Sequence, residues 1–396
     1  MNVNDLRAAT AIMAVEPRWT GMTTLETVLP EAKRRKWLLH AGPPFSSWAE
    51  VPEPLRNSAM QACQLEGWAD SEDESLRLLS DGDITLEPAQ NHDCVVPLAG
   101  VISPGMALHV VEDGTNAGSR SYAAVNEGMQ HCLRLGIRDP HLTAHHTWLN
   151  STLALWLTAV LRETGPVDLL PLMRNSLELG DDGHNRTIAG SRLVTERLLS
   201  SATGETPPGI RDFLDSCPAF ALNLWMAAAA LCLRAAEGIP KTSSITRAGG
   251  NGVSFGIQIG AKPGVWFSCA AEPPRGPRER NYDGLKVLGA IGDSAVVDFF
   301  GMGGGALGHA PDTVTALSDY APFNALSRPQ SVMTAQHTAL PIRTGVSCDS
   351  VLNAGLAPIV LLGMIEACGL EGRIGGGAYE PSLQLFKAAA ISEESV

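Results

Sequence analysis

The spacing of apolar residues predicts a mostly helical segment between about residues 118 and 239. Its clearest part is 148–161, where apolar side chains recur three and four positions apart and would share one face of a helix. The same spacing, less regular, predicts a helix over 122–133. Three further helices are expected at 167–178, 187–201 and 220–236. The last of them is apolar nearly all round, which indicates a buried helix.

Shorter apolar runs, broken by glycine and proline, dominate the flanking segments and predict strands. Before the helical segment we expect strands at 37–41, 95–103 and 106–111, and helix within 52–82. After Pro240 we expect strands at 243–247, 253–260, 265–271, 287–291 and 295–300, and a final helix at 381–390. The apolar run 356–364 suits either a buried strand or a short helix. The fold class predicted is α+β, with mixed α/β parts and Gly-rich loops flanking a mostly helical central subdomain. The parts proposed are 1–117, 118–240 and 241–396, since 396 residues are long for one core.

The stretch 180–190, GDDGHNRTIAG, places several reactive side chains directly before a predicted helix. Free N–H groups and the positive end of the dipole favour an anion at a helix N-terminus. We therefore predict that Asp181, Asp182, Asn185 and Arg186 bind substrate and that His184 is an acid–base group. The alternative is a capped turn, in which an aspartate or Asn185 is the N-cap.

A second concentration of reactive groups follows at His92, Asp93 and Cys94. In a loop these side chains can share one site, whereas on a strand neighbours point to opposite faces. A His–Asp or Cys–His pair suits acid–base or nucleophilic work, so all three are predicted to be catalytic, with Cys94 as the nucleophile of any covalent intermediate. The alternative is one buried thiol and one capping aspartate.

Glycine-rich turns in the last third of the chain supply further candidates for binding. Asn251 lies in the hairpin signal GGNG, and Asp293 follows a predicted strand. Gly303 and Gly304 lie in GMGGGA, which we interpret as a nest of backbone N–H groups for an anion or carbonyl oxygen. The dinucleotide fingerprint it partly matches lacks its βαβ context, and no P-loop sequence occurs.

Composition and charge restrict the partners. Carboxylates outnumber Lys and Arg and give a formal net charge of −13, which argues against nucleic acid or an anionic membrane as partner. An anionic ligand must then be held by local arginines or N–H groups. The N-terminus is polar, no apolar run approaches the roughly 20 residues of a membrane span, and the eight cysteines form no CxxC pair. We expect reduced thiols and a cytoplasmic location.

Five motifs together resemble the YlbE/AllG family: LHAGPP at 39–44, NHDC with LAGVIS within 91–103, GDDGHNRTIAG at 180–190, NGVSFG at 251–256 and GDSAVVDFFGMGG at 292–304. The resemblance extends over about residues 37–390. It implies an α+β protein related to a subunit of oxamate carbamoyltransferase, which moves a carbamoyl group between oxalurate and phosphate. It also implies a longer N-terminal region in family members, so this chain is expected to be a shortened one.

The chemistry expected is therefore carbamoyl or amide-type group transfer, or hydrolysis, on a small ureido- or carbamoyl-bearing acid. Phosphate or carbamoyl phosphate would be the second substrate, without a cofactor. A homo-oligomer is expected, and partner subunits are an option. One alternative is a metal-dependent hydrolase, with His40, His92, Asp93, Asp182 and His184 around one ion. The other is a non-catalytic, ligand-binding subunit.

Overall fold

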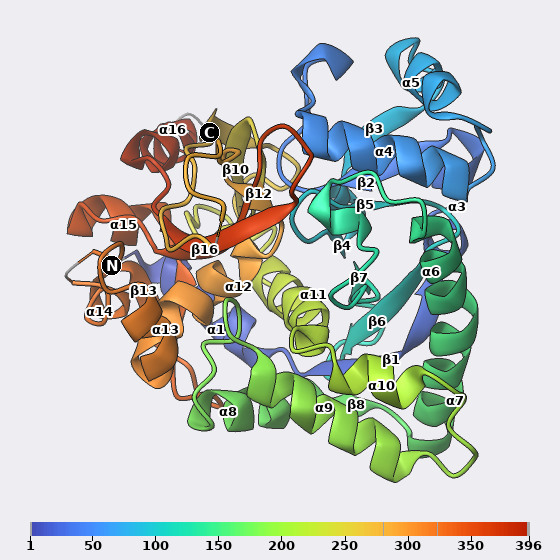
Figure 1. Cartoon of the computed structure of the whole chain (residues 1–396). Coiled ribbons are helices and arrows are strands. Elements are labelled where there is room, and N and C mark those ends of the chain that lie inside the picture. The colour runs from blue at the N-terminus through green and yellow to red at the C-terminus, as the bar shows by residue number, and fades with distance from the viewer. Residues whose placement is uncertain (1, 280, 323, 394–396) are drawn as a thin grey trace.

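Helix α11 (Phe220–Arg234) lies at the centre of the fold, as its apolar sequence predicts. The computed structural model describes residues 2–279, 281–322 and 324–393. Within α11 only Leu222 and Arg234 are not fully buried. The helix packs between a five-stranded sheet on one side and α12 (Ala295–Phe300) on the other, so it joins the two halves seen in Figure 1.

The five-stranded sheet has the order β4-β7-β6-β1-β8. Its strands are β1 (Pro17–Thr24), β4 (Cys94–Val95), β6 (Ala107–Asp113), β7 (Arg120–Ala124) and β8 (Val167–Asp168). All neighbours are antiparallel except β4 and β7. A smaller sheet, β3-β2-β5, is built from β2 (Trp37–His40), β3 (Thr85–Pro88) and β5 (Val101–Ile102).

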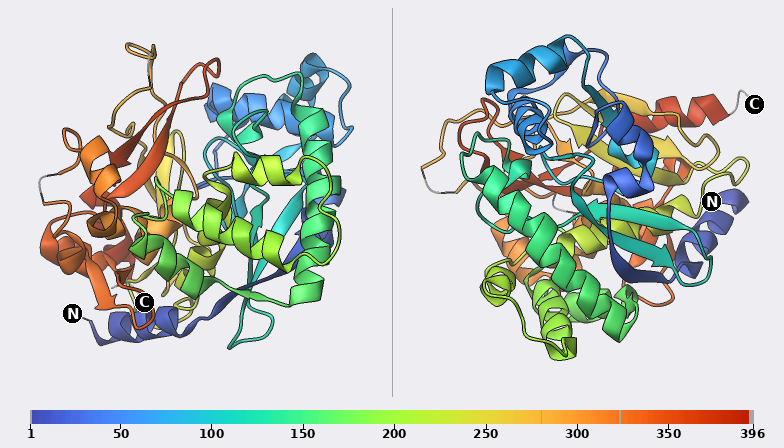
Figure 2. Two further views of the ribbon diagram at one scale, coloured as in Figure 1. Left: turned by 60° about the horizontal axis from the view of Figure 1, so that its bottom comes forward. Right: turned by 90° about the vertical axis from the view of Figure 1, so that its right-hand side faces the viewer.

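A group of helices, coloured green in Figures 1 and 2, packs along strand β1 and against α11. They are α6 (Leu142–Trp148), a π-helical turn (Leu149–Leu153), α7 (Ala154–Thr164), α8 (Leu169–Glu178), α9 (Ile188–Ser201) and α10 (Ile210–Asp215). The helices predicted at 148–161, 167–178 and 187–201 are thus confirmed. The helices beside the smaller sheet are α2 (Leu25–Val28), α3 (Pro30–Arg34), α4 (Glu53–Leu65) and α5 (Glu72–Ser80), with a 3₁₀ turn at Trp48–Glu50.

The helix predicted over 122–133 is wrong. This segment contains β7, a loop and a 3₁₀ turn (Leu133–Leu135). Burial in β7 alternates, with Ser121 and Ala123 inside, which is the period of a strand in a half-buried sheet. Gly128 then takes a left-handed conformation that would break a helix.

The C-terminal part is β-rich, as predicted, and its main sheet has the order β11-β10-β9-β12. Its strands are β9 (Ile245–Asn251), β10 (Ser254–Ile259), β11 (Phe267–Ala270) and β12 (Ile291–Gly292). Two hairpins accompany it, β13 (Met333–Gln336) with β14 (Arg343–Val346) and β15 (Val360–Ile365) with β16 (Arg373–Tyr379). The helices of this part, besides α12, are α13 (Pro311–Ala316), α14 (Pro329–Val332), α15 (Cys348–Ala354) and α16 (Leu383–Glu393), with a 3₁₀ segment at Gly303–His309. A further 3₁₀ segment, Ala89–His92, lies in the N-terminal part.

The strand predicted at 295–300 is wrong, because this segment is helix α12. All six of its residues are buried, and a short apolar run buried on every side carries no periodicity that distinguishes strand from helix. The strand expected at 287–291 is reduced to β12, with one isolated bridge between Val287 and Glu366.

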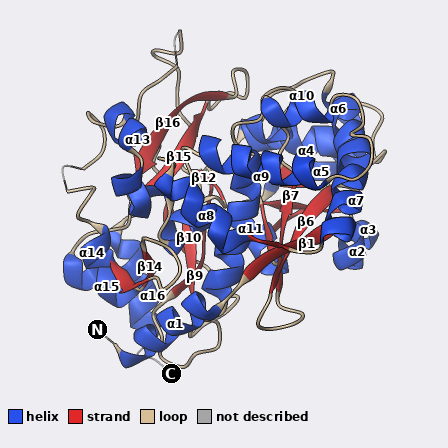
Figure 3. Ribbon diagram, turned by 90° about the horizontal axis from the view of Figure 1, so that it is seen from below, coloured by secondary structure: helices blue, strands red, loops and turns tan. Residues whose placement is uncertain are grey.

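Two hydrophobic cores hold the chain together. The larger one includes Ala8, Leu157 and Phe386, and so draws on all three parts that the sequence suggested. The smaller one lies under α4 and β2 and reaches Leu142. The boundaries at 117 and 240 stay a prediction. Helices α1 (Val3–Ala14) and α16 lie on the same side of the molecule (Figure 3). Within the described ranges no helix is both long and apolar enough to cross a bilayer.

The N-terminal helix is fastened by one buried carboxylate, which gives a test of its importance. Asp5 accepts hydrogen bonds from Thr242 Oγ1 (2.8 Å), Ser243 N (2.8 Å) and Ser243 Oγ (3.0 Å). Asp5→Ala leaves these donors without their acceptor, so we expect the free energy of unfolding to fall by about 1–3 kcal/mol. Urea denaturation checks this, with Asp83→Ala on the surface as the control that changes little. Equal stability of the two variants would contradict it.

Candidate active-site cleft

A cleft of about 490 Å³ opens where the start of α9, the start of α11, α13 and the β15–β16 hairpin meet. Apolar side chains such as Leu98, Leu222 and Leu361 form part of its wall. The charged groups that line it, among the described residues, are Arg134, Arg186, Arg373, Glu279, Asp312 and Glu371, with His184 beside them. Formal charges on these arginines and carboxylates cancel, in a chain whose net charge is −13. The cleft lining is therefore close to neutral, whereas the protein as a whole is acidic.

The stretch singled out in the sequence forms one wall of this cleft, and two glycines shape it. Gly180 and Gly183 both have positive φ, at 97° and 86°. A Cβ on Gly183 would lie 2.1 Å from Cε of Met302, so a side chain at position 183 would also collide with the buried side chain of Met302. A hydrogen bond from the Gly183 N–H to Arg186 O, at 3.0 Å, closes this turn of the backbone.

The two aspartates of this stretch hold the backbone and do not face the cleft as ligands. Both are fully buried. Asp182 Oδ1 accepts from the N–H groups of His184 (2.7 Å), Asn185 (2.7 Å) and Arg186 (3.3 Å), and its Oδ2 accepts from Thr313 Oγ1 (2.7 Å). Burial raises the pKa of Asp182, although these donors act in the opposite direction. Its predicted role in binding substrate is replaced by a role in shaping the turn.

Asp181 acts as a distant cap for α9. Its Oδ2 accepts from Ser176 Oγ and from the N–H of Gly190 in the first turn of the helix, both at 2.8 Å. Thr187, the residue at the N-cap position, makes no capping bond with its side chain. The capped turn considered in the sequence therefore exists, and it coexists with a position on the cleft wall.

His184 lies on the cleft wall, and its ring is held by a buried carboxylate. The distance from His184 Nδ1 to Asp298 Oδ2 is 2.6 Å. This contact sets the ring orientation and directs the other nitrogen, Nε2, away from Asp298. A histidine with one nitrogen on a carboxylate and the other at a cleft is suited to proton transfer.

Asn185 and Arg186 also line the cleft, and their predicted role in binding substrate stays a prediction. Arg186 Nη2 lies 3.1 Å from Asp312 Oδ2, and Arg186 Nε lies 3.8 Å from Asp181 Oδ1. The Asp312 side chain is 71% exposed, so water screens this pair and the guanidinium can exchange its partner for a ligand.

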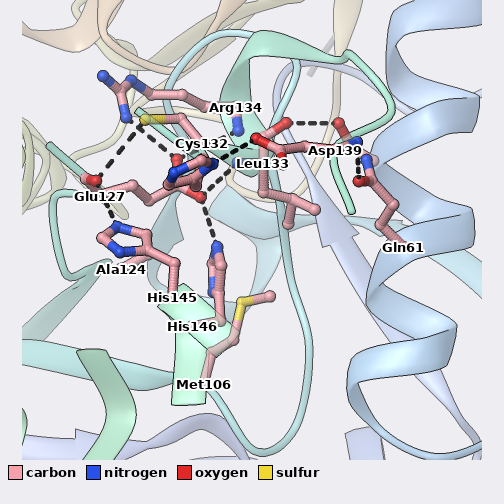
Figure 4. A network of polar contacts seen from close by, with 12 residues as sticks. Gln61, Met106, Ala124, Glu127, Cys132, Leu133, Arg134, Asp139, His145 and His146 are labelled. Carbon is pink, nitrogen blue, oxygen red and sulfur yellow. Dashed lines mark hydrogen bonds and ion pairs between the residues drawn. The ribbon is translucent and has the colours of Figure 1, made fainter. Parts of the chain in front are cut away.

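Sequence reasoning missed Asp298, Arg134 and Arg373. Asp298 was part of a quoted motif, but the segment was taken for a strand. Arg134 lies just after the helix wrongly predicted over 122–133, and Arg373 precedes a glycine run; neither arginine belongs to a motif of its own. Figure 4 shows the surroundings of Arg134, including Glu127 and His146.

His92, Asp93 and Cys94 lie outside the set that lines the cleft. Cys94 is fully buried in β4, and burial, reinforced by nearby Asp93 and Asp293, raises the pKa of its thiol. A thiol of that kind is a poor nucleophile. The Asp93 carboxylate pairs with Arg234 at 3.0 Å and Arg247 at 3.4 Å. The arrangement matches the alternative of a buried thiol, so the predicted nucleophile lacks support from geometry.

The other binding candidates are occupied within the protein. Asn251 Nδ2 donates to Pro43 O, and its Oδ1 accepts from the backbone of the β9–β10 turn. The N–H of Gly303 donates to Asp182 O, and that of Gly304 donates to Asp298 Oδ1, both at 2.8 Å. These two N–H groups face carboxyl and carbonyl oxygens of the chain, so the nest that we expected there is wrong.

Asp293 is likewise a structural carboxylate. Its Oδ1 accepts from Gly42 N (2.9 Å) and Gln90 Nε2 (2.6 Å), and its Oδ2 accepts from Val96 N (3.0 Å). It thus ties three positions of the N-terminal part to the segment that precedes α12. Its neighbour Ser294, and not Asp293, lines the cleft.

In the part of the chain that the structure describes, no group of three or more His, Cys, Asp and Glu side chains is arranged to hold a metal ion. His40, which the metal alternative included, is fully buried with its Nδ1 at 2.8 Å from Ala41 O. The roles proposed for the remaining site residues stay predictions.

Comparisons with known proteins agree with the resemblance seen in the sequence. Residues 84–294 match the family model described as oxamate carbamoyltransferase subunit AllG. The chain is 28% identical to AllG of Escherichia coli over 96% of this chain and 94% of that one, so little of AllG lies outside the match. It is also 28% identical to YahG of E. coli, an uncharacterized protein, over 97% and 84% of the two chains. A crystal structure of a conserved protein of unknown function from Enterococcus faecalis superposes with a TM-score of 0.93, at 26% identity, over 99% and 97%.

Asp293 should make stability depend on pH. Burial raises its pKa to about 7, although its hydrogen-bond donors act in the opposite direction. The folded state then binds a proton more tightly than the unfolded state, so stability falls as pH rises from about 4 to about 7, by at most about 1.4 kcal/mol per pH unit from this group. Urea denaturation of the wild type and Asp293→Asn across this window checks it, since the variant should lose this part of the slope. Identical slopes would contradict the assignment.

Proposed function

Because the chain belongs to the AllG family, we propose that it binds a small carbamoyl- or ureido-bearing acid in the cleft and takes part in transfer of the carbamoyl group. The AllG relative is described as a subunit of oxamate carbamoyltransferase, which makes carbamoyl chemistry the first class to consider. The cleft offers cationic side chains for the acid and a histidine for proton transfer, and this combination supports the assignment.

The observation that carries the proposal is the His184–Asp298 pair at the cleft wall. In transfer to phosphate, a phosphate oxygen bonds to the carbamoyl carbon, the C–N bond to the acid breaks, and the leaving nitrogen takes up a proton. His184 Nε2 is the proposed donor of that proton, and in the reverse direction it removes a proton from the attacking nitrogen. Asp298 keeps the ring oriented through its contact with Nδ1.

The neighbouring groups have matching roles. Arg186, whose partner Asp312 is exposed, is proposed to bind a negatively charged end of a substrate. The amide of Asn185 is proposed to donate a hydrogen bond to the carbonyl oxygen, on which negative charge grows during the reaction.

We also propose that the chain works with partner subunits, because its AllG relative is described as a subunit. A cytoplasmic setting is part of this proposal, because cysteines such as Cys63, Cys94 and Cys232 are buried as thiols and not as disulfides. In such an assembly the chain either carries the catalytic cleft or completes a partner's site, and the following experiment separates the two.

Carbamoyl transfer from oxalurate to phosphate is to be measured with the purified chain, alone and together with the proposed partner subunits. We expect His184→Gln to lower kcat by about 10²- to 10⁴-fold, because the proton donor is lost. Asp298→Asn should act similarly. His309→Gln is the matched control, since His309 is only half-buried and lies outside the cleft, with its Nε2 at 2.9 Å from Pro341 O.

Two results would overturn the proposal. One is an assembled wild type without carbamoyl transfer. The other is a His184→Gln variant that keeps wild-type kcat in the assembly, which would identify the chain as a non-catalytic subunit. Circular dichroism and the melting temperature establish that each variant is folded.

A further inference from the structure

Two arginines that are far apart in the sequence meet at one wall of the cleft. Arg134 lies on the 3₁₀ turn (Leu133–Leu135), and Arg373 begins β16. These segments pack closely, because a Cβ on Gly372 would lie only 3.2 Å from Leu135 Cβ. Burial lowers the pKa of Arg373, and the nearby charge of Arg134 acts in the same direction. Two cations held this close favour an anion between them.

Arg373 lies across a pair of glycines. Gly363 and Gly376 are opposite each other in the β15–β16 hairpin. A Cβ on Gly363 would lie 3.4 Å from Arg373 Nε, and a Cβ on Gly376 would lie 3.1 Å from Arg373 Nη2 and 3.0 Å from Asn185 Oδ1. The absence of side chains at these two positions therefore leaves the room in which Arg373 and Asn185 come together. The glycine run 375–377, for which the sequence suggested no use, has a function here.

The Arg134 guanidinium is fixed by contacts with Glu127 and with the backbone of Gly128. Its Nη1 lies 3.2 Å from Glu127 Oε2, and its Nη2 donates to Gly128 O at 2.5 Å (Figure 4). Glu127 also accepts from the N–H of Leu133 at 2.7 Å and lies 2.8 Å from His146 Nε2. Glu127 thus fixes the Arg134 guanidinium. Arg373 Nη1 lies 3.1 Å from Oε1 of the exposed Glu279, a partner that an anion can replace.

We propose that Arg134 and Arg373 form a subsite for a small oxyanion, either the carboxylate of the substrate acid or phosphate, with Asn185 beside it. A guanidinium matches both groups with two parallel hydrogen bonds, and a second guanidinium supplies the charge that an acidic protein otherwise lacks. The identification of the anion as part of a substrate rests on the proposed function, whereas the binding of an oxyanion does not.

Binding is to be measured by isothermal titration of the full chain with oxamate and, separately, with inorganic phosphate. At least one of them should bind the wild type with one site, and its Kd should rise by about tenfold or more in Arg373→Gln. Arg134→Lys should weaken binding in the same direction, because lysine lacks the planar fork. Gly376→Ala should also weaken it, since the added methyl group displaces only the mobile ends of Arg373 and Asn185.

Matched controls are Arg192→Gln, an exposed arginine on α9, and Gly308→Ala, where a Cβ meets nothing within 4 Å. The ligand that binds identifies the source of the oxyanion. The proposal is overturned if neither ligand binds the wild type, or if folded Arg373→Gln and Gly376→Ala bind as the wild type does. An assembled wild type that binds the oxyanion through Arg373 but transfers no carbamoyl group would refute the proposed function and leave the subsite standing.

Discussion

The carboxylate of Asp298 is the contact on which the arrangement of the cleft depends. It is fully buried in α12. Its Oδ2 holds His184 at 2.6 Å, and its Oδ1 accepts from Gly304 N (2.8 Å) and Leu361 N (3.1 Å). Three segments distant in the sequence thus meet at one side chain: the stretch before α9, the glycine-rich 3₁₀ segment and the hairpin that carries Arg373. A buried carboxylate requires such donors, since burial without them is costly.

Asp182 complements this contact from the other side. It gathers three successive N–H groups of the stretch and binds Thr313 on α13, while its own carbonyl oxygen accepts from Gly303. The carboxylates of Asp182 and Asp298 accept hydrogen bonds from nearby backbone N–H groups, which are therefore not available to a ligand. What stays directed at the cleft is His184, Asn185 and Arg186. Of the charged or titratable residues in this stretch, the two aspartates hold the backbone, and His184 and Arg186 are thereby positioned at the cleft.

The sequence allowed the helices with clear periodicity, the α+β class and the stretch 180–190 to be predicted, because these depend on local spacing. The predictions failed at α12, because residues buried on every side show no periodic alternation of apolar and polar positions. They also failed at β7, because its apolar residues happen to recur at approximately helical spacing. The site was only partly predictable for the same reason. His184 carries a local signal, whereas Arg134 and Arg373 acquire their meaning from long-range packing. Nor does sequence distinguish an aspartate that binds ligand from one that binds backbone, as Asp293 illustrates.

Net charge sets the last constraint on how such a site can be built. In a chain of net charge −13, a ligand anion is repelled at long range and must be compensated nearby. Each arginine of the cleft has a carboxylate partner, but the partners differ. Glu127 is buried and fixes Arg134, whereas Asp312 and Glu279 are exposed and screened by water. The exposed ion pairs Arg186–Asp312 and Arg373–Glu279 cost little to separate, so Arg186 and Arg373 can turn to an incoming anion. Arg134 keeps its position, because its partner Glu127 is buried.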